Sequence, residues 1–182
     1  MYRGTNKTAL GSQRQIARAM MALLREKPYE RITVSELCRE ADISRQTFYT
    51  LFTSRENVVV FTLRAGDFDA PEMDSVEKEC GGSMPLTLLC RAYSEYLLKN
   101  RDLIKLLVDN HIDYLLYDSF FESMDQCLCF LPQADPCTRS YAASFYAGGI
   151  ACVARRYAQE GCSATLEGLQ ALLHTLLSGG LF

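Results

Sequence analysis

Residues 33–56 constrain the fold of this 182-residue chain most strongly, because they hold three helix-start signals separated by short turns. Residues 33–36 read Thr-Val-Ser-Glu, the capping-box pattern in which the threonine and the glutamate satisfy the first backbone N–H groups of a helix. Ser44 can cap a following short helix, and residues 53–56 (Thr-Ser-Arg-Glu) repeat the capping box before another. Together with a tight turn at Asp42-Ile43, this spacing predicts a helix-turn-helix.

The rest of the sequence is also typical of helices. Apolar residues over 9–27 recur at helical spacing, and Lys27-Pro28 should end that helix because the residue before proline avoids the helical region. Residues 66–84 are expected to form a loop. Further helices are expected over 86–99, 101–109, 112–130 and 136–160, ending near Gly161, and from a cap at Ser163 to Gly179-Gly180. We therefore predict an all-α fold of about nine helices.

Composition excludes several classes of protein. Hydrophobic residues make up 48% of the chain and charged residues 23%, which is typical of a globular protein and not of a disordered or fibrous one. Apolar runs such as residues 58–61 are too short to cross a bilayer, which takes ~20 residues. No secretory signal is evident, so we expect a cytoplasmic protein with no membrane partner.

The eight cysteines do not have the spacing of a metal site. There is no Cys-x-x-Cys pair, Cys127 and Cys129 form only a Cys-x-Cys, and His111 and His174 lie far apart. Without an export signal we expect reduced thiols that act mostly as small buried apolar side chains, with a redox-sensing thiol as the alternative. We expect neither a metal nor a cofactor.

Sequence motifs of common enzymes are missing. The chain has no GxSxG, Walker or Rossmann motif. Asp109 and Asp113 are spaced i, i+4, but a charged helix face explains them. We therefore expect no catalytic residues and no enzymatic activity.

Charge is unevenly distributed along the chain. The formal net charge is −3, yet residues 1–55 hold ten Lys and Arg against five Asp and Glu, a net charge of +5. The remaining nine basic and seventeen acidic residues leave −8 on the rest of the chain. A basic N-terminal part on an acidic body indicates that the N-terminal part binds a polyanion.

The helix predicted after Ser44 has an outer face rich in hydrogen-bonding groups. Phe48 and Phe52 can anchor its inner side against Leu37 and Leu24. The outer face then presents Ser44, Arg45, Gln46, Thr47 and Tyr49. In a major groove, arginine can bind guanine and glutamine can bind adenine, whereas threonine and tyrosine hydroxyls commonly bind phosphates. A merely solvated polar face is the alternative, but the turn spacing and the charge of +5 favour contact with DNA.

Phosphate contacts are expected around this helix. The helix starts at Thr33 and Thr53 offer backbone amides and a partial positive charge to anions. Arg55 and Lys7 would add salt-dependent attraction to the DNA backbone.

Residues 33–56, within a match over about residues 10–60, resemble the DNA-binding motif of the tetracycline-repressor (TetR) family. The resemblance implies that Thr33, Tyr49 and Arg55 contact phosphates and that Ser44, Arg45, Gln46 and Thr47 form the base-facing start of the recognition helix. The sequence departs from the family pattern at Cys38, Asp42, Gln46, Leu51 and Arg55. Gln46 adds a long side chain at the DNA face, and Leu51 replaces a histidine that often contacts phosphate.

The second part of the chain resembles the regulatory half of the same family. Residues 145–150 (Phe-Tyr-Ala-Gly-Gly-Ile), with residues 155–157 and Gly161, resemble a penultimate helix that joins the last helix in a four-helix dimer interface between two chains. The two glycines cost about 1 kcal/mol each of helix propensity, which close approach of another helix would offset. A tight contact inside one chain is the alternative. The expected interface residues are Tyr141, Phe145, Gly148, Gly149, Cys152, Leu169, Leu173 and Leu176.

An aromatic-rich middle region could hold a small-molecule effector. The expected pocket residues are Tyr93, Tyr96, His111, Tyr114, Phe121 and Phe145. Tyr96 and His111 would be polar groups among apolar rings, as in many ligand pockets. The alternatives are an aromatic core and, for His111, a capping or surface position.

These patterns predict a DNA-binding helix-turn-helix domain over residues 1–65 and a helical effector-binding and dimerisation domain over residues 66–182. We interpret the chain as a homodimeric bacterial transcriptional repressor, released from a near-palindromic operator by a small-molecule effector. The alternative is a co-regulator of similar fold whose C-terminal domain binds a partner protein instead of a metabolite.

Overall fold

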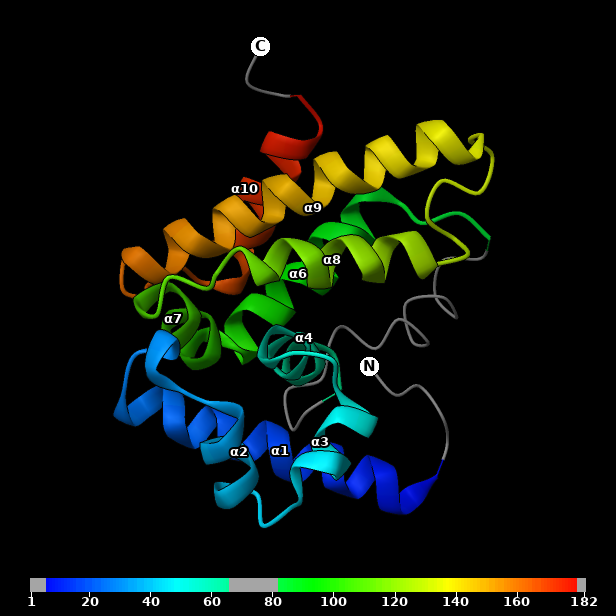
Figure 1. Ribbon diagram of the computed structural model, residues 1–182. Helices are drawn as coiled ribbons and strands as arrows, with labels where there is room; N and C mark the ends of the chain where they lie inside the picture. Colours follow the sequence, from blue (N-terminus) through cyan, green and yellow to red (C-terminus); the bar gives the residue numbers. More distant parts are fainter. Residues whose placement is uncertain (1–5, 66–81, 180–182) are drawn as a thin grey trace. The chain divides into compact units, whose positions relative to one another are not determined.

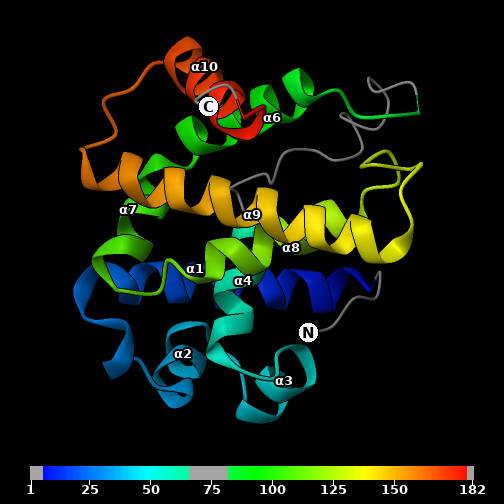
Figure 2. The same cartoon turned by 90° about the horizontal axis from the view of Figure 1, so that it is seen from above.

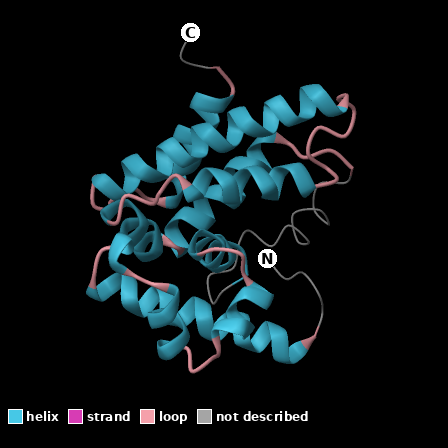
Figure 3. Ribbon diagram, in the orientation of Figure 1, coloured by secondary structure: helices cyan, strands magenta, loops and turns pink. Residues whose placement is uncertain are grey.

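The computed structural model describes residues 6–65 and 82–179 of the protein (Figure 1). Within these ranges the chain forms nine α-helices and no strand (Figure 3), so the predicted all-α fold is confirmed. The chain divides into two compact units, Met1–Phe68 and Asp69–Phe182. The domain boundary predicted between residues 65 and 66 adjoins residues 66–81, which lie outside the described residues together with most of the predicted loop, and it stays a prediction.

The first unit is built around its first helix. Its elements are α1 (Lys7–Glu26), the short 3-10 helix η1 (Tyr29–Arg31), α2 (Val34–Glu40), α3 (Arg45–Leu51) and α4 (Arg55–Ala65). The buried stripe of α1, which includes Ile16 and Met20, faces this unit's core, and α1 contacts α2, α3 and α4. α1 ends as predicted, because Lys27 before Pro28 has an extended backbone with φ −156°.

The predicted caps of α2 and α3 are present. Thr33 Oγ1 accepts a hydrogen bond from Glu36 N at 3.2 Å, and Glu36 Oε2 accepts one from Thr33 N at 3.0 Å, which completes the capping box. Ser44 Oγ accepts a hydrogen bond from Thr47 N at 3.0 Å. Between the two helices Asp42 has a left-handed backbone with φ 51°, which aspartate tolerates better than most residues.

The predicted cap of α4 was wrong by one residue. Ser54 Oγ, and not Thr53 Oγ1, accepts the hydrogen bond from the first turn, donated by Asn57 N at 3.3 Å. Thr53 Oγ1 instead donates to Asn57 Oδ1. The Glu56 carboxylate accepts a hydrogen bond from Tyr29 Oη at 2.7 Å and also bonds to the Ser54 side chain at the helix start.

The second unit consists of α6 (Leu86–Lys99), α7 (Arg101–Asp109), α8 (Leu115–Gln126), α9 (Pro136–Gln159) and α10 (Leu166–Leu177). α9 contacts α7, α8 and α10, while α6 contacts α7 and α10 (Figure 2). Small residues on the buried face of α9, Ala143, Ala147 and Ala154, are fully enclosed. They let neighbouring helices pack closely against α9.

Two predicted helix limits in this unit were wrong. The helix expected over 112–130 is shorter, because His111 has a left-handed backbone (φ 56°) and Cys127 has an extended one. The last helix begins after Thr165 and not after Ser163, since Thr165 Oγ1 accepts a hydrogen bond from Gly168 N at 3.2 Å. Gly161 follows α9 with φ 76°, as expected of a residue that ends a helix.

Candidate nucleic-acid interface

Buried aromatic rings fix the position of α3. Phe48 and Phe52 are almost fully enclosed, and their ring centroids lie 6.0 Å apart. Phe52 also packs edge-on against Phe61 of α4, with centroids 5.6 Å apart. Phe48 on this seven-residue helix and Phe52 directly after it hold α3 against the core of the first unit, so its opposite side is presented in a defined orientation.

The outer side of α3 carries Arg45, Gln46 and Tyr49, all exposed. Within the described part of the chain, neither the Arg45 guanidinium nor the Gln46 side-chain amide has a hydrogen-bond partner. Tyr49 is 53% exposed, and its ring rests edge-on against Phe48 with centroids 5.3 Å apart. These three side chains therefore project polar groups from a rigid helix, as base and phosphate contacts require.

Ser44 and Thr47 are partly used by the helix itself. Ser44 Oγ accepts from Thr47 N and lies 2.9 Å from Thr47 Oγ1, so the two hydroxyls form one hydrogen-bonded pair at the start of α3. Any contact that they make with DNA has to share these oxygens with the cap.

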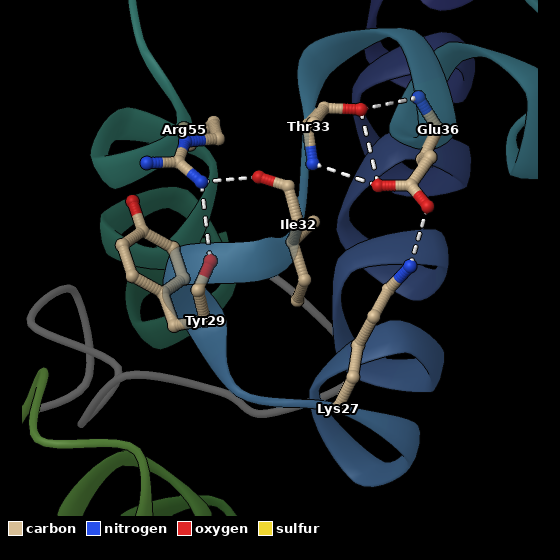
Figure 4. Close-up of polar contacts among 6 residues, drawn as sticks. All are labelled: Lys27, Tyr29, Ile32, Thr33, Glu36 and Arg55. Carbon is tan, nitrogen blue, oxygen red and sulfur yellow. Dashed lines mark hydrogen bonds and ion pairs between the residues drawn. The ribbon is translucent and has the colours of Figure 1, made fainter.

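Arg55 is tied to the polypeptide that precedes α2. Its Nη1 donates to Tyr29 O at 3.1 Å and to Ile32 O (Figure 4). The guanidinium carbon lies 4.6 Å from the centroid of the Tyr29 ring, a cation–π contact. Because both hydrogens of Nη1 serve these carbonyls, Arg55 holds the start of α4 against η1, and only its other nitrogens remain for a phosphate.

A second polar contact joins the end of α1 to the start of α2. Lys27 Nζ lies 2.5 Å from Glu36 Oε1, while Glu36 Oε2 accepts from Thr33 Oγ1 at 3.0 Å (Figure 4). The lysine first, and then the backbone and hydroxyl of Thr33, lower the pKa of Glu36 to about 2. The Thr33 hydroxyl proton is thus directed to a carboxylate inside the chain. Lys7 and Thr53, the other predicted phosphate contacts, are exposed.

The structure places the predicted effector residues in different surroundings, and their assignment to one pocket stays a prediction. Tyr93 and Tyr96 are buried and pack edge-on against Phe120, with centroids 5.0 and 5.5 Å apart, so they belong to the core. His111, Tyr114 and Phe145 are exposed instead. Phe121 stacks on Tyr117, with centroids 6.0 Å apart. For Tyr93 and Tyr96 these contacts favour the alternative of an aromatic core.

The predicted dimer residues divide into an exposed and a buried group. Tyr141 and Phe145 of α9 are 75% and 68% exposed. Leu169 and Leu173 of α10 are 1% and 0% exposed within a single chain, yet both line the groove between α9 and α10, so their part in an interface stays a prediction. They face into the second unit, where α10 contacts α6 and α9.

An apolar groove of about 500 Å³ lies between α9 and α10. Phe145, Gly149 and Cys152 line it from α9, and the exposed Leu172 and Leu176 line it from α10. Sequence reasoning missed Leu172, which lies three residues after Leu169 on a helix rich in leucine. A side chain at Gly149 would begin 3.3 Å from Leu177 Cδ2, so this glycine allows a close contact inside the chain, while Gly148 has open space.

Among the described residues, no cluster of three or more His, Cys, Asp or Glu side chains could hold a metal ion. None of the helices in these ranges is long and apolar enough to span a bilayer.

Solved structures of similar fold include the following two proteins. One is described as "Dihydroxyacetone kinase operon activator DhaS", with a TM-score of 0.53 and 23% identity over 93% of this chain and 95% of that one. The other is the fatty acid degradation regulator FadR from Bacillus halodurans, with a TM-score of 0.57 and 19% identity over 100% of this chain and 98% of that one. At these identities the likeness shows the fold alone.

Comparison with curated proteins gave no match. Residues 16–60 match the family described as bacterial regulatory proteins, tetR family. The matched segment runs from the buried stripe of α1 through α2 and α3 into α4, and so contains the capped helix-turn-helix and its exposed polar edge. The match shows that residues 16–60 of this chain form a helix-turn-helix DNA-binding domain of the tetR family.

Proposed function

We propose that the protein is a transcriptional repressor that reads its operator through the outer edge of α3. The observation that carries this proposal is that Arg45, Gln46 and Tyr49 project from a helix whose inner side is fixed by Phe48 and Phe52. Arg45 and Gln46 would bind base edges in the major groove, with Ser44 and Thr47 beside them. Tyr49, Thr33, Thr53, Arg55 and Lys7 would contact phosphates and set the register.

We further propose that the protein acts as a homodimer. One short recognition helix reads few base pairs, and a second copy doubles both the contacts and the salt sensitivity. The face that we assign to the dimer comprises Tyr141, Phe145, Gly148 and Cys152 of α9 with Leu172 and Leu176 of α10. Large apolar side chains exposed along one groove support this assignment, because such patches commonly mark interfaces between proteins.

Release from the operator by a small-molecule effector is part of the same proposal. An effector shifts the dimer between two states only by its different affinity for them. Its site is left open, because two of the aromatic residues predicted for it are buried and others are exposed. If the second unit binds a partner protein instead, the exposed apolar groove between α9 and α10 is the observation that favours such a co-regulator. In either case we propose a cytoplasmic protein without enzymatic activity.

Selection of bound oligonucleotides from a random duplex pool tests the proposal. We expect an enriched near-palindrome whose half-sites lie about 34–36 Å apart, or a multiple of that distance. Sedimentation equilibrium should show a dimer at the concentrations used for binding. A monomer that leaves duplex DNA unbound even in dilute salt would exclude both parts. A metabolite thermal-shift screen and pull-down with the intact protein then separate the effector from the partner protein.

A further inference from the structure

Two cysteine sulfurs touch in the turn between α8 and α9. Cys127 ends α8, and a β-turn closed by Phe130 N donating to Cys127 O at 3.2 Å brings Cys129 back beside it. The two Sγ atoms lie 3.2 Å apart without a bond between them. The residues are 1% and 5% exposed, whereas Leu128 between them is exposed, so the pair lies just beneath the surface of the second unit.

An arginine from the next helix holds this turn in shape. Arg139 Nε donates to Phe130 O at 2.9 Å, and its Nη2 donates to Cys127 O at 2.6 Å and to Asp125 O at 2.8 Å. On the other side, Met84 N donates to Cys129 O at 2.8 Å. With the carbonyls of both cysteines fixed, the sulfurs stay in contact without the loss of entropy that bringing two loose thiols together would cost.

We propose that Cys127 and Cys129 form a dithiol site that a hydroperoxide converts reversibly into a disulfide. A disulfide needs the sulfurs about 2.05 Å apart, so they must move closer by only about 1 Å from their present contact. A metal ion suits this pair of sulfurs less well than oxidation does, because zinc takes four protein ligands in structural sites. The described residues contain no third donor that would join the two cysteines in such a site.

The chemistry balances with the hydroperoxide as the oxidant. One thiolate attacks a peroxide oxygen, the O–O bond breaks, and the sulfur becomes a sulfenic acid as the alcohol or water leaves with that thiol's proton. The second sulfur attacks the sulfenic sulfur, the S–S bond forms, and hydroxide leaves as water with the second proton. The two sulfurs lose two electrons in total, and a dithiol reductant returns them by thiol–disulfide exchange.

The test treats the folded full-length protein with hydrogen peroxide, blocks remaining thiols with an alkylating agent and analyses the peptides by mass spectrometry. We expect the peptide with Cys127 and Cys129 to escape alkylation, to lose the mass of two hydrogen atoms and to recover both thiols after dithiothreitol. The single variants Cys127→Ser and Cys129→Ser should not form this product, and Cys137→Ser, an exposed position on α9, should still form it.

Other outcomes would overturn the proposal. In the first, the peptide with Cys127 and Cys129 stays unchanged while the exposed Cys137 or Cys152 is oxidised. In the second, Cys127 or Cys129 forms a disulfide with Cys137. Metal retained by the reduced protein and lost on substitution of either turn cysteine would likewise replace the disulfide with a metal site.

The role of Arg139 provides an independent measurement. Equilibration with glutathione buffers should show the disulfide of Arg139→Ala to be less stable by roughly tenfold, or about 30 mV, because the turn no longer holds the sulfurs together. Arg156→Ala is the matched control, since Arg156 lies on the same helix but pairs with Glu160 on the surface at 2.7 Å. Equal equilibrium constants for the two folded variants would count against the turn as the cause.

Discussion

The two units use aromatic side chains in opposite ways. In the first, Phe48 and Phe52 are enclosed and leave the other side of α3 polar. In the second, Tyr93 and Tyr96 are enclosed around Phe120, but Phe145 stays on the surface beside an apolar groove. The first unit thus presents hydrogen-bonding groups on a fixed support, while the second leaves apolar surface uncovered. This contrast matches a polar partner, DNA, for one unit and an apolar partner for the other.

The largest expected effect follows from removing the aromatic support of α3. Phe48→Ala should lower the free energy of unfolding by about 3–5 kcal/mol, because it leaves a cavity in a fully enclosed site. DNA binding should be lost with it. Urea denaturation followed by circular dichroism measures the first effect, and fluorescence anisotropy with the selected operator measures the second.

Tyr49→Ala is the matched control for that variant. Its ring is the neighbour of Phe48 but is 53% exposed, so its loss should change stability little while it weakens DNA binding. Equal losses of stability in the two variants would mean that α3 is not anchored through its inner face.

A charge on the apolar face should break the proposed dimer. Phe145→Glu replaces an exposed ring with a carboxylate, so the single chain should stay folded while self-association weakens by about 2 kcal/mol or more, as at an interface hot spot. Sedimentation equilibrium measures the dissociation constant. Gln159→Glu, which adds the same charge at an exposed position near the end of α9, should leave it unchanged. If both variants remain dimeric, the groove has another occupant.

The first unit could be predicted in detail because its signals are local. Thr33 and Glu36, which form the capping box of α2, are three positions apart, and so are Ser44 and Thr47 at the start of α3. Both partners of each contact therefore lie in one short stretch of sequence. At the start of α4, local contacts are joined by a distant one. Glu56 accepts a hydrogen bond from Tyr29, which lies 27 residues away, and no local sequence pattern predicts that contact.

The second unit was less predictable because its faces depend on distant partners. Leu169, Leu172, Leu173 and Leu176 all lie on α10, and which of them are buried is decided by where α6 and α9 cross that helix. Helical spacing indicates that aromatic residues such as Tyr93 and Tyr96 share one face of a helix. It does not indicate whether that face fills the core or lines a ligand pocket. The hydrogen-bonded turn around Cys127 and Cys129 could not be predicted either, because Arg139 reaches it from another helix.

Arg45→Ala tests which residues of the first unit contact bases. Loss of a bidentate contact should cost about 1–3 kcal/mol at one base pair and relax specificity there, with stability unchanged because the side chain is exposed. Repeating the oligonucleotide selection with the variant measures the specificity at each position. A selection profile identical to that of the unmodified protein would remove Arg45 from the base-reading group.

Arg55→Lys separates a structural from a phosphate-binding role. Lysine keeps the charge but lacks the planar fork, so the contacts with the carbonyls of Tyr29 and Ile32 should be lost, at about 1–2 kcal/mol of stability. If Arg55 mainly contacts phosphate, Arg55→Lys should instead preserve the stability. In that case Arg55→Ala should reduce the slope of log binding constant against log salt concentration by about 1. Denaturation and a salt titration of binding, carried out on both variants, distinguish these outcomes.

The smallest expected effect concerns the contact of Glu36 with Lys27 and Thr33. The folded-state pKa of Glu36, about 2, lies below its ordinary value of 4.5, so the contact stabilises the folded state fully above that ordinary value. The stabilisation should fall as the pH drops from 4.5 towards 2, because protonation then favours the unfolded chain. Glu36→Gln should remove this part of the pH dependence, measured by denaturation at several pH values.

Glu167→Gln, which changes an exposed carboxylate in the first turn of α10, is the control and should leave the dependence intact. An unaltered pH profile for Glu36→Gln would show that the contact between α1 and α2 contributes nothing to holding the first unit together.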